Sequence, residues 1–353
     1  MLLWIAFAQA EGHQPKLGVG DNGLATDAEI NAPLAIAVDG SRTLYIAEFL
    51  GVIRRVDLKS GIIATVQTAT KLGSISSLAL DTSGNLLAAE FAVDRVCRID
   101  PRTGSVTTIA GGRRLEFSGD GGPALDAGLS RPQSVVTDAR GNLYITDLGN
   151  SRIRRVDAHT GIITTVAGGG RRDSSGDGGP ALDAGLEYPD SAVVDRDGNL
   201  FIAQYGYGQD SHRIRRVDAK TGIITTAAGL AKAGVTGDGG PALSAGLQFP
   251  SNLLLDRAGN LYVVDPVNDR VRFIDAETHS IRTIAGSSKG FGGDGGPAVR
   301  ARLDNPSSIA MDSEGNLYIA EFMNNRIRRV DVHTGTIRTV AGNGFPHNPR
   351  ISL

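Results

Sequence analysis

The stretch from Arg131 to Gly170 reads RPQSVVTDARGNLYITDLGNSRIRRVDAHTGIITTVAGGG, and the stretch from Asn305 to Gly344 reads NPSSIAMDSEGNLYIAEFMNNRIRRVDVHTGTIRTVAGNG. The same pattern occurs six times along the chain of 353 residues. The first apolar run of each copy ends in an Asp, at Asp39, Asp81, Asp138, Asp195, Asp256 and Asp312. These Asp residues lie 42 to 61 residues apart. Repetition at such a period predicts one array of similar units rather than two unrelated domains.

Each copy contains four short runs rich in Val, Ile, Thr and Tyr, which are typical of β-strands. Gly, Asn and Asp stand between these runs and favour tight turns. A sheet of four such strands is marginal by itself, so it must pack face to face against its neighbours. Radial packing of repeated sheets forms a propeller. The sequence therefore predicts an all-β fold, a six-bladed β-propeller of four-stranded antiparallel blades.

The copies divide the chain into one propeller with short ends. We expect the propeller over residues 31–344, after a link at 11–30 and before a tail at 345–353. The expected blades are approximately 31–67, 74–112, 131–170, 188–230, 249–288 and 305–344.

The first ten residues, MLLWIAFAQA, are apolar and end in A-x-A form. This pattern predicts the remnant of a secretory signal peptide, and hence an extracytoplasmic (periplasmic or secreted) protein. The alternative is a first β-strand that joins the ring. No apolar run approaches the length of about 20 residues that a membrane-spanning helix needs.

The pattern P-x-S-[IV]-[AV]-x-D, followed by G-N-L-Y and by N-x-R-I-R-R-V-D, resembles the NHL repeat from Asn31 to Gly344. Bacterial, exported NHL domains of this appearance occur as sensors and scaffolds. Some NHL propellers bind RNA through a basic surface. Here the formal net charge is −2, and acidic residues offset the repeated Arg-Arg pairs, so we expect no nucleic-acid partner.

Two further features recur in nearly every copy. A loop of the form GDGGPALDAGL precedes five of the six units, and its Gly, Pro and Ala/Leu content predicts a turn followed by a helix over the blade junction. A turn or cap explains the loop Asp better than calcium, because a calcium loop gathers several oxygen ligands. An acid ends the second run, and we expect it to pair with the Arg five residues later. Cys97 replaces an Arg and is expected to be a neutral strand residue.

The fourth copy breaks the pattern and is the best candidate for a site. Its loop after the second run is four residues longer than the equivalent loop at 148–151, and Gln204 replaces the acid. Aromatic residues presented by glycines suit ligand contact, although surfaces also tolerate neutral loop expansion. Residues that follow the Pro before each first run should rim the central channel. The candidate binding residues are Gln133, Asp190, Gln204, Tyr205, Tyr207, His212 and Asn252.

The sequence contains no catalytic, metal-binding or nucleotide-binding motif that we tested. We therefore expect a monomeric, non-enzymatic binding or scaffold propeller whose loop face and channel mouth meet a protein, peptide or glycan, without a cofactor. The alternative is a metal-dependent enzyme with a channel site, resembling gluconolactonase, strictosidine-synthase-like or peptidyl-amidoglycolate lyase propellers. That alternative needs several converging ligands, and Asp190 with Asn252 is the best pair. A single divalent cation in the channel stays possible under either hypothesis.

Overall fold

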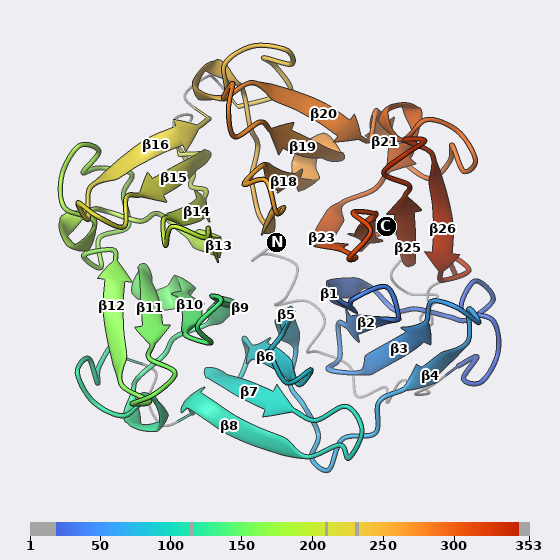
Figure 1. Cartoon of the computed structure of the whole chain (residues 1–353), viewed down its shortest axis with the longest axis horizontal. Helices are drawn as coiled ribbons and strands as arrows, with labels where there is room; N and C mark the ends of the chain where they lie inside the picture. The colour runs from blue at the N-terminus through green and yellow to red at the C-terminus, as the bar shows by residue number, and fades with distance from the viewer. Residues whose placement is uncertain (1–18, 113–115, 209–210, 230–232, 346–353) are drawn as a thin grey trace.

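Six four-stranded antiparallel sheets form a ring, which confirms the predicted six-bladed propeller (Figure 1). The computed structural model describes residues 19–112, 116–208, 211–229 and 233–345. The predicted signal-peptide remnant at 1–10 therefore lies outside the described residues. In each blade the strands follow chain order from the centre of the ring outward.

The blades consist of short strands, mostly of five or six residues. Blades 1 to 3 contain β1 (Pro33–Asp39), β2 (Thr43–Glu48), β3 (Ile53–Asp57), β4 (Ile63–Thr65), β5 (Ile75–Leu80), β6 (Leu86–Glu90), β7 (Arg95–Ile99), β8 (Val106–Gly111), β9 (Pro132–Thr137), β10 (Leu143–Asp147), β11 (Arg152–Val156) and β12 (Ile163–Ala167). Blades 4 to 6 contain β13 (Pro189–Val194), β14 (Leu200–Gln204), β15 (Arg213–Val217), β16 (Ile224–Ala228), β17 (Leu253–Leu255), β18 (Leu261–Asp265), β19 (Arg270–Ile274), β20 (Ile281–Ala285), β23 (Pro306–Met311), β24 (Leu317–Glu321), β25 (Arg326–Val330) and β26 (Ile337–Ala341). Two short parallel strands, β21 (Ser288–Lys289) and β22 (Arg302–Leu303), lie between blades 5 and 6.

The apolar core is divided among the six junctions between neighbouring blades. Successive side chains of a strand point to opposite faces of its sheet. Ile145 of β10 therefore packs with Leu87 and Val96 of blade 2, whereas its neighbour Tyr144 packs with Ile202 of blade 4. Each blade thus depends on both neighbours for burial, as expected for a repeat that is unstable alone.

Inner strands are also joined by polar side chains. In five of the six blades the Ser of the P-x-S pattern, or Asn252 in its place, accepts a hydrogen bond from a backbone N–H of the next inner strand. Ser134 Oγ, for example, accepts from Ala192 N at 3.4 Å. Blade 1 has Ala35 at this position and cannot form the bond. The recurring Ser is therefore explained by the architecture.

The ring closes between blade 1 (blue in Figure 1) and blade 6 (red), each built from one continuous stretch of chain. Ala32 N donates to Asn325 Oδ1 at 2.8 Å, and Ile36 N donates to Ser308 Oγ at 3.2 Å. Gly342 N donates to the backbone oxygen of Ala25 at 2.8 Å. Closure therefore rests on sheet packing and these bonds rather than on a blade shared by the two ends.

The recurring GDGGP loops cover the blade junctions, and the helix expected after each turn is a short 3-10 helix. Each forms a single 3-10 turn of three residues, and the Pro precedes the turn in extended conformation. A longer helix is excluded because the next residue returns to extended backbone, and this sends Leu129 into the core. The 3-10 turns are η1 (Ala124–Asp126), η3 (Ala181–Asp183), η4 (Ala242–Ser244) and η6 (Ala298–Arg300), with η2 (Leu148–Asn150) and η5 (Pro266–Asn268) between strands. None of the described helices is long and apolar enough to cross a membrane.

Two expectations about the charged residues were wrong, because both acids concerned pair with one buried arginine. The fully buried Arg154 lies between the loop Asp120 and the strand Asp147, with its Nη2 and Nη1 atoms 2.8 and 3.3 Å from their carboxylate oxygens. Asp120 is therefore an ion-pair partner rather than a turn or cap residue. Asp147 pairs with Arg154, two residues beyond the expected Arg152. Equivalent arginines lie between two acids in blades 1, 5 and 6, at Arg54, Arg272 and Arg328.

Blade 2 shows what happens without this arginine. It lacks the preceding GDGGP loop, and Cys97 stands where Arg154 stands in blade 3. Here the expected pair does form, with Arg95 Nε 2.8 Å from Glu90 Oε1. Cys97 Sγ donates to the same carboxylate at 3.0 Å. Burial and Glu90 raise the pKa of the Cys97 thiol to about 12, so the thiol is unreactive in the folded protein.

Candidate functional site

The long loop between β14 and β15 brings together an aromatic cluster, which consists of Tyr188, Tyr205, Tyr207, His212 and Phe249. Tyr188 and Tyr205 stack with their ring centroids 5.6 Å apart, and Tyr207 meets Tyr188 edge-on at the same separation. Phe249 lies 5.3 Å from Tyr205 and 4.6 Å from His212. Tyr207 is 78% exposed, so its ring is presented to solvent. The cluster joins blade 4 to the start of blade 5.

Gly206 allows this loop to lie against Glu187. A Cβ atom at Gly206 would lie 2.0 Å from the carboxyl carbon of Glu187, so a larger residue would displace that flexible side chain. The glycine between the two tyrosines therefore leaves room for the Glu187 carboxylate. It also places the Glu187 carboxylate beside the aromatic cluster.

His212 serves the architecture as well as the cluster. Its Nδ1 atom accepts a hydrogen bond from Phe249 N at 3.3 Å, as Asp94 and Asp269 accept from the equivalent N–H groups at other junctions. Only 7% of His212 is exposed, and burial lowers its pKa although Glu187 opposes this. The imidazole is therefore neutral at pH 7.

Asp190 is the most unusual ionisable group of the region. It is the second residue of the inner strand β13, lies in a bulge between Pro189 and Ser191, and is 7% exposed. Among the described residues its carboxylate forms no hydrogen bond or ion pair. Burial raises its pKa to about 7, and its charge adds to the burial that raises the pKa of Tyr205. A buried carboxylate without a donor is costly, so its retention needs an explanation.

The positions equivalent to Asp190 in the two neighbouring blades also hold buried polar side chains. We call the residues that follow the Pro at the start of each blade, or Ile75 in blade 2, the rim residues: Leu34, Ser76, Gln133, Asp190, Ser251 and Ser307. Ser76 and Ser307 donate to backbone oxygens of the next blade. Gln133 and Ser251 are 5% and 8% exposed, and no partner for either side chain occurs among the described residues. Three consecutive blades thus present an amide, a carboxylate and a hydroxyl at buried positions, and the hydroxyl of Ser251 has no hydrogen-bond partner among the described residues.

Two of the predicted site residues lie in the framework. Gln204 is fully buried, donates through Nε2 to Ser174 Oγ at 2.8 Å and accepts from Arg215 Nη1 at 3.4 Å. It therefore occupies the place of the strand acid in the other blades. Asn252 Oδ1 accepts from Ile309 N at 3.0 Å, which is the bond between inner strands described above. The structure brings Asp190 near Tyr205, but it engages Asn252 with blade 6.

Sequence reasoning did not include Tyr188, Phe249 or Glu187. The first two directly precede the Pro of their inner strands, where blades 1, 3 and 6 have Ala32, Arg131 and Asn305. An aromatic residue occurs at this position in only two copies, and this difference could have indicated from the sequence that both residues belong to the site. Ser251 was recognised as a rim residue without being chosen for the site.

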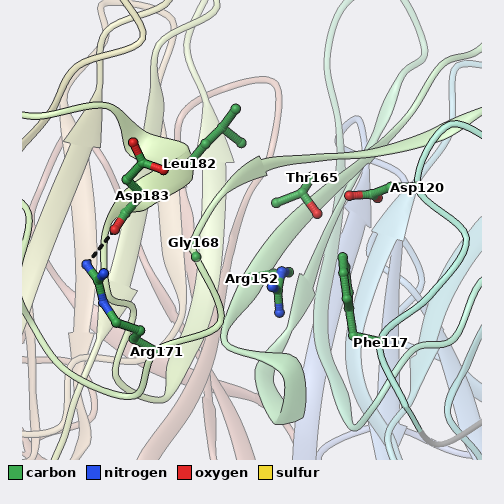
Figure 2. A pocket seen from close by; sticks show the side chains of 9 residues that line it. Phe117, Asp120, Arg152, Thr165, Gly168, Arg171, Leu182 and Asp183 are labelled. Carbon is green, nitrogen blue, oxygen red and sulfur yellow. Dashed lines mark hydrogen bonds between the residues drawn. The ribbon is translucent and has the colours of Figure 1, made fainter.

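A separate pocket of about 330 Å³ lies at the outer part of blade 3 and the link that follows it. Figure 2 shows Arg152 beside Phe117, and the guanidinium carbon is 3.7 Å from the ring centroid. The same stack recurs between Arg326 and Phe291 in blade 6 at 3.9 Å. Because it repeats, we regard this arrangement as part of the framework.

The described residues contain no group of three or more His, Cys, Asp and Glu side chains placed to hold a metal ion. The rim contributes one carboxylate, which is fewer than the ligands of usual calcium or zinc sites.

The chain resembles parts of larger proteins in sequence. No family model matches it. Human teneurin-1 is 26% identical over 361 residues, which cover 92% of this chain and 13% of teneurin-1. Bovine NHL repeat-containing protein 2 is 28% identical over 251 residues, which cover 63% of this chain and 34% of that protein. The chain therefore spans only a minor part of either relative.

Solved structures with the same fold come from several kinds of protein. An auxiliary nutrient-binding protein from Bacteroides ovatus superposes with a TM-score of 0.64 at 16% identity, over 92% of this chain and 73% of that one. A gluconolactonase from Xanthomonas campestris superposes with a TM-score of 0.56 at 13% identity, over 88% and 96%. Fold and repeat together define a six-bladed propeller of four-stranded blades. The similarities in sequence and fold support an NHL-repeat β-propeller.

Proposed function

We propose that this protein is a non-enzymatic binding propeller, and that its site comprises Gln133, Asp190 and Ser251 with the adjacent aromatic cluster. The observation that carries the proposal is the row of buried polar rim residues on three consecutive blades, in which Ser251 Oγ has no hydrogen-bond partner among the described residues. Buried polar groups in folded proteins nearly always have partners, so a ligand that supplies them explains the arrangement. The exposed ring of Tyr207 extends the same surface, and aromatic side chains dominate many binding sites.

The partner classes that suit this surface are a protein, a peptide or a glycan, met outside the cytoplasm by a monomer. The nutrient-binding neighbour supports a binding role for this fold, but its ligand is not inferred for this chain. The lactonase neighbour makes the enzymatic alternative worth a test. That alternative relied on Asp190 with Asn252, and the Asn252 oxygen is engaged by Ile309 N. A stoichiometric, tightly bound divalent ion in purified protein would favour the enzyme and overturn the binding proposal.

The proposal is tested with Tyr207→Ala and a matched control. Screening of the full chain against peptide and glycan arrays identifies a ligand, whose affinity is then measured by calorimetry. Because Tyr207 is exposed, its loss should weaken binding at least tenfold without changing the unfolding temperature. Phe345 is also exposed, at 69%, but lies after the last strand of blade 6, so Phe345→Ala should bind normally. Equal affinity of Tyr207→Ala and wild type would remove the aromatic cluster from the site.

A further inference from the structure

The pocket at the outer part of blade 3 contains an arginine whose hydrogen bonds are incomplete. Arg152 Nη1 donates to the backbone oxygen of Asn150 at 3.0 Å, and the stack on Phe117 covers one face of the guanidinium. The Nε and Nη2 atoms form no hydrogen bond with any residue that the structure describes. The edge of the guanidinium that carries these two atoms is therefore available to a ligand.

The equivalent arginines of blades 5 and 6 have a further bond that blade 3 lacks. Arg270 Nη2 donates to the backbone oxygen of Ser287 at 2.7 Å. Arg326 Nη2 donates likewise to Asn343 at 2.6 Å. The aromatic stack recurs in blade 6, but this bond does not recur in blade 3. A framework role therefore explains the stack and leaves the open arginine edge unexplained.

A threonine that lines the same pocket also lacks its usual bond. Thr226 and Thr339 of blades 4 and 6 donate to the Asp of the preceding loop at 2.6 and 2.7 Å. The equivalent Thr165 Oγ1 is buried and has no partner among the described residues. Thr65 and Thr283 share this feature. Blade 3 is distinguished because its unpaired hydroxyl and its open arginine edge line one pocket of about 330 Å³.

A second cation lines this pocket. Arg171 follows Gly170, which lies against the Arg152 guanidinium, since a Cβ atom at Gly170 would be 2.6 Å from Nη1. The backbone oxygen of Asp183 accepts from Arg171 Nη2 (Figure 2). Arg171 Nε lies 3.7 Å from the Asp173 carboxylate, which is too long for a hydrogen bond. The pocket thus presents two guanidinium groups.

The rest of the lining suits an apolar framework. Phe117 and Leu182 are 38% and 54% exposed. Asp120 also lines the pocket, but its Oδ1 atom accepts from Arg154 Nη2 at 2.8 Å and from Nε at 3.1 Å. The charge of Asp120 is therefore already paired and does not oppose an anion.

We propose that this pocket binds a carboxylate group carried on an apolar framework, with Arg152 as its principal partner. A carboxylate accepts two parallel hydrogen bonds from one guanidinium edge and matches its charge. A neutral carbonyl would replace only the single bond that Ser287 supplies in blade 5. A bare phosphate would make no use of Phe117 and Leu182. This site is separate from the rim and does not depend on the proposed function.

The test is calorimetric titration of the full chain with three probes at pH 7. Phenylacetate supplies the carboxylate on an apolar framework, phenylacetamide is its neutral isostere, and inorganic phosphate is an anion without the framework. We expect phenylacetate to bind at one site and about tenfold more tightly than either of the others, because it alone meets both the arginine edge and the apolar lining.

Three variants locate the binding. Arg152→Gln should weaken phenylacetate binding about tenfold. Arg326→Gln is the matched control, because it removes the same stacked arginine from blade 6, where Asn343 already engages the side chain, and it should leave the affinity unchanged. Arg171 is 57% exposed, so Arg171→Gln should keep the fold and weaken binding about threefold.

The outcomes decide the inference. Phenylacetamide binding as tightly as phenylacetate, or phosphate binding more tightly, would overturn the assignment of a carboxylate. Equal affinity of wild type and Arg152→Gln would show that the probe binds elsewhere. An equal loss in Arg152→Gln and Arg326→Gln would assign the effect to the stack in general and overturn the site in blade 3. Failure of phenylacetate to bind the wild type would also overturn it.

Discussion

Replacing Asp190 by Asn should stabilise the protein at pH 8, although Asp190 is the centre of the proposed site. The carboxylate is buried without a partner among the described residues, and its pKa is about 7 instead of 3.8. The folded protein therefore binds more protons than the unfolded chain between these values. Its stability falls as the pH rises from about 3.8 to about 7 and is level above that, because the folded protein must then hold a buried charge.

The size of the effect follows from the pKa difference. Each unit corresponds to about 1.4 kcal/mol, so a difference of about three units costs on the order of 4 kcal/mol at pH 8. Below the unfolded pKa the carboxyl is neutral in both states, and the cost should fall under about 1 kcal/mol at pH 4. The Asn amide does not titrate. The stability gained by the variant should therefore grow by about 3 kcal/mol from pH 4 to pH 8.

Urea denaturation of both proteins at several pH values measures this growth. Asp147 and Asp265, whose burial raises their pKa to about 6, are present in both proteins and cancel in the comparison. A constant difference between wild type and Asp190→Asn across this range would refute the reasoning, because it would mean that Asp190 titrates as an exposed acid. Gln133→Ala serves as the control for a change at the rim that alters no charge.

Three further predictions concern the framework. Arg154→Met leaves Asp120 and Asp147 without their shared cation, and should cost about 3–5 kcal/mol in urea denaturation. Ser134→Ala removes a hydrogen bond between inner strands and should cost about 1 kcal/mol in the same assay; a loss too small to measure would contradict its role in joining blades. The Cys97 thiol should not react with a thiol reagent at pH 8 until the protein is denatured, and one equivalent should react then.

The repeat was sufficient to predict the fold because each blade is specified by short-range signals. Strand propensity and turn residues lie within one copy, and the copies must pack together since none can bury its own faces. The charged residues were harder to place. Asp147 and Arg152 are indeed opposite each other in the hairpin, as their spacing predicts. The ion pair nevertheless forms with Arg154, because the loop carrying Asp120 returns from 34 residues away and draws that side chain inward.

The site was predictable in part. The irregular fourth copy directed attention to Tyr205, Tyr207 and Asp190, which the structure places in one region. Gln204 broke the pattern equally clearly, yet its amide lies in the framework with Ser174 and Arg215. A departure from the repeat shows that a position differs, but only the direction of the side chain shows whether it reaches the surface.

The sequence by itself determined the number of blades, their strands and the positions where the copies differ, because all of these are encoded within single repeats. Only the tertiary structure decided which side chains remain unsatisfied. Whether Gln133, Asp190 or Ser251 has a partner depends on the neighbouring blade, as the bonded Ser76 and Ser307 show at equivalent positions. The same dependence brings Tyr188 and Phe249, which are 61 residues apart in the chain, into one aromatic cluster.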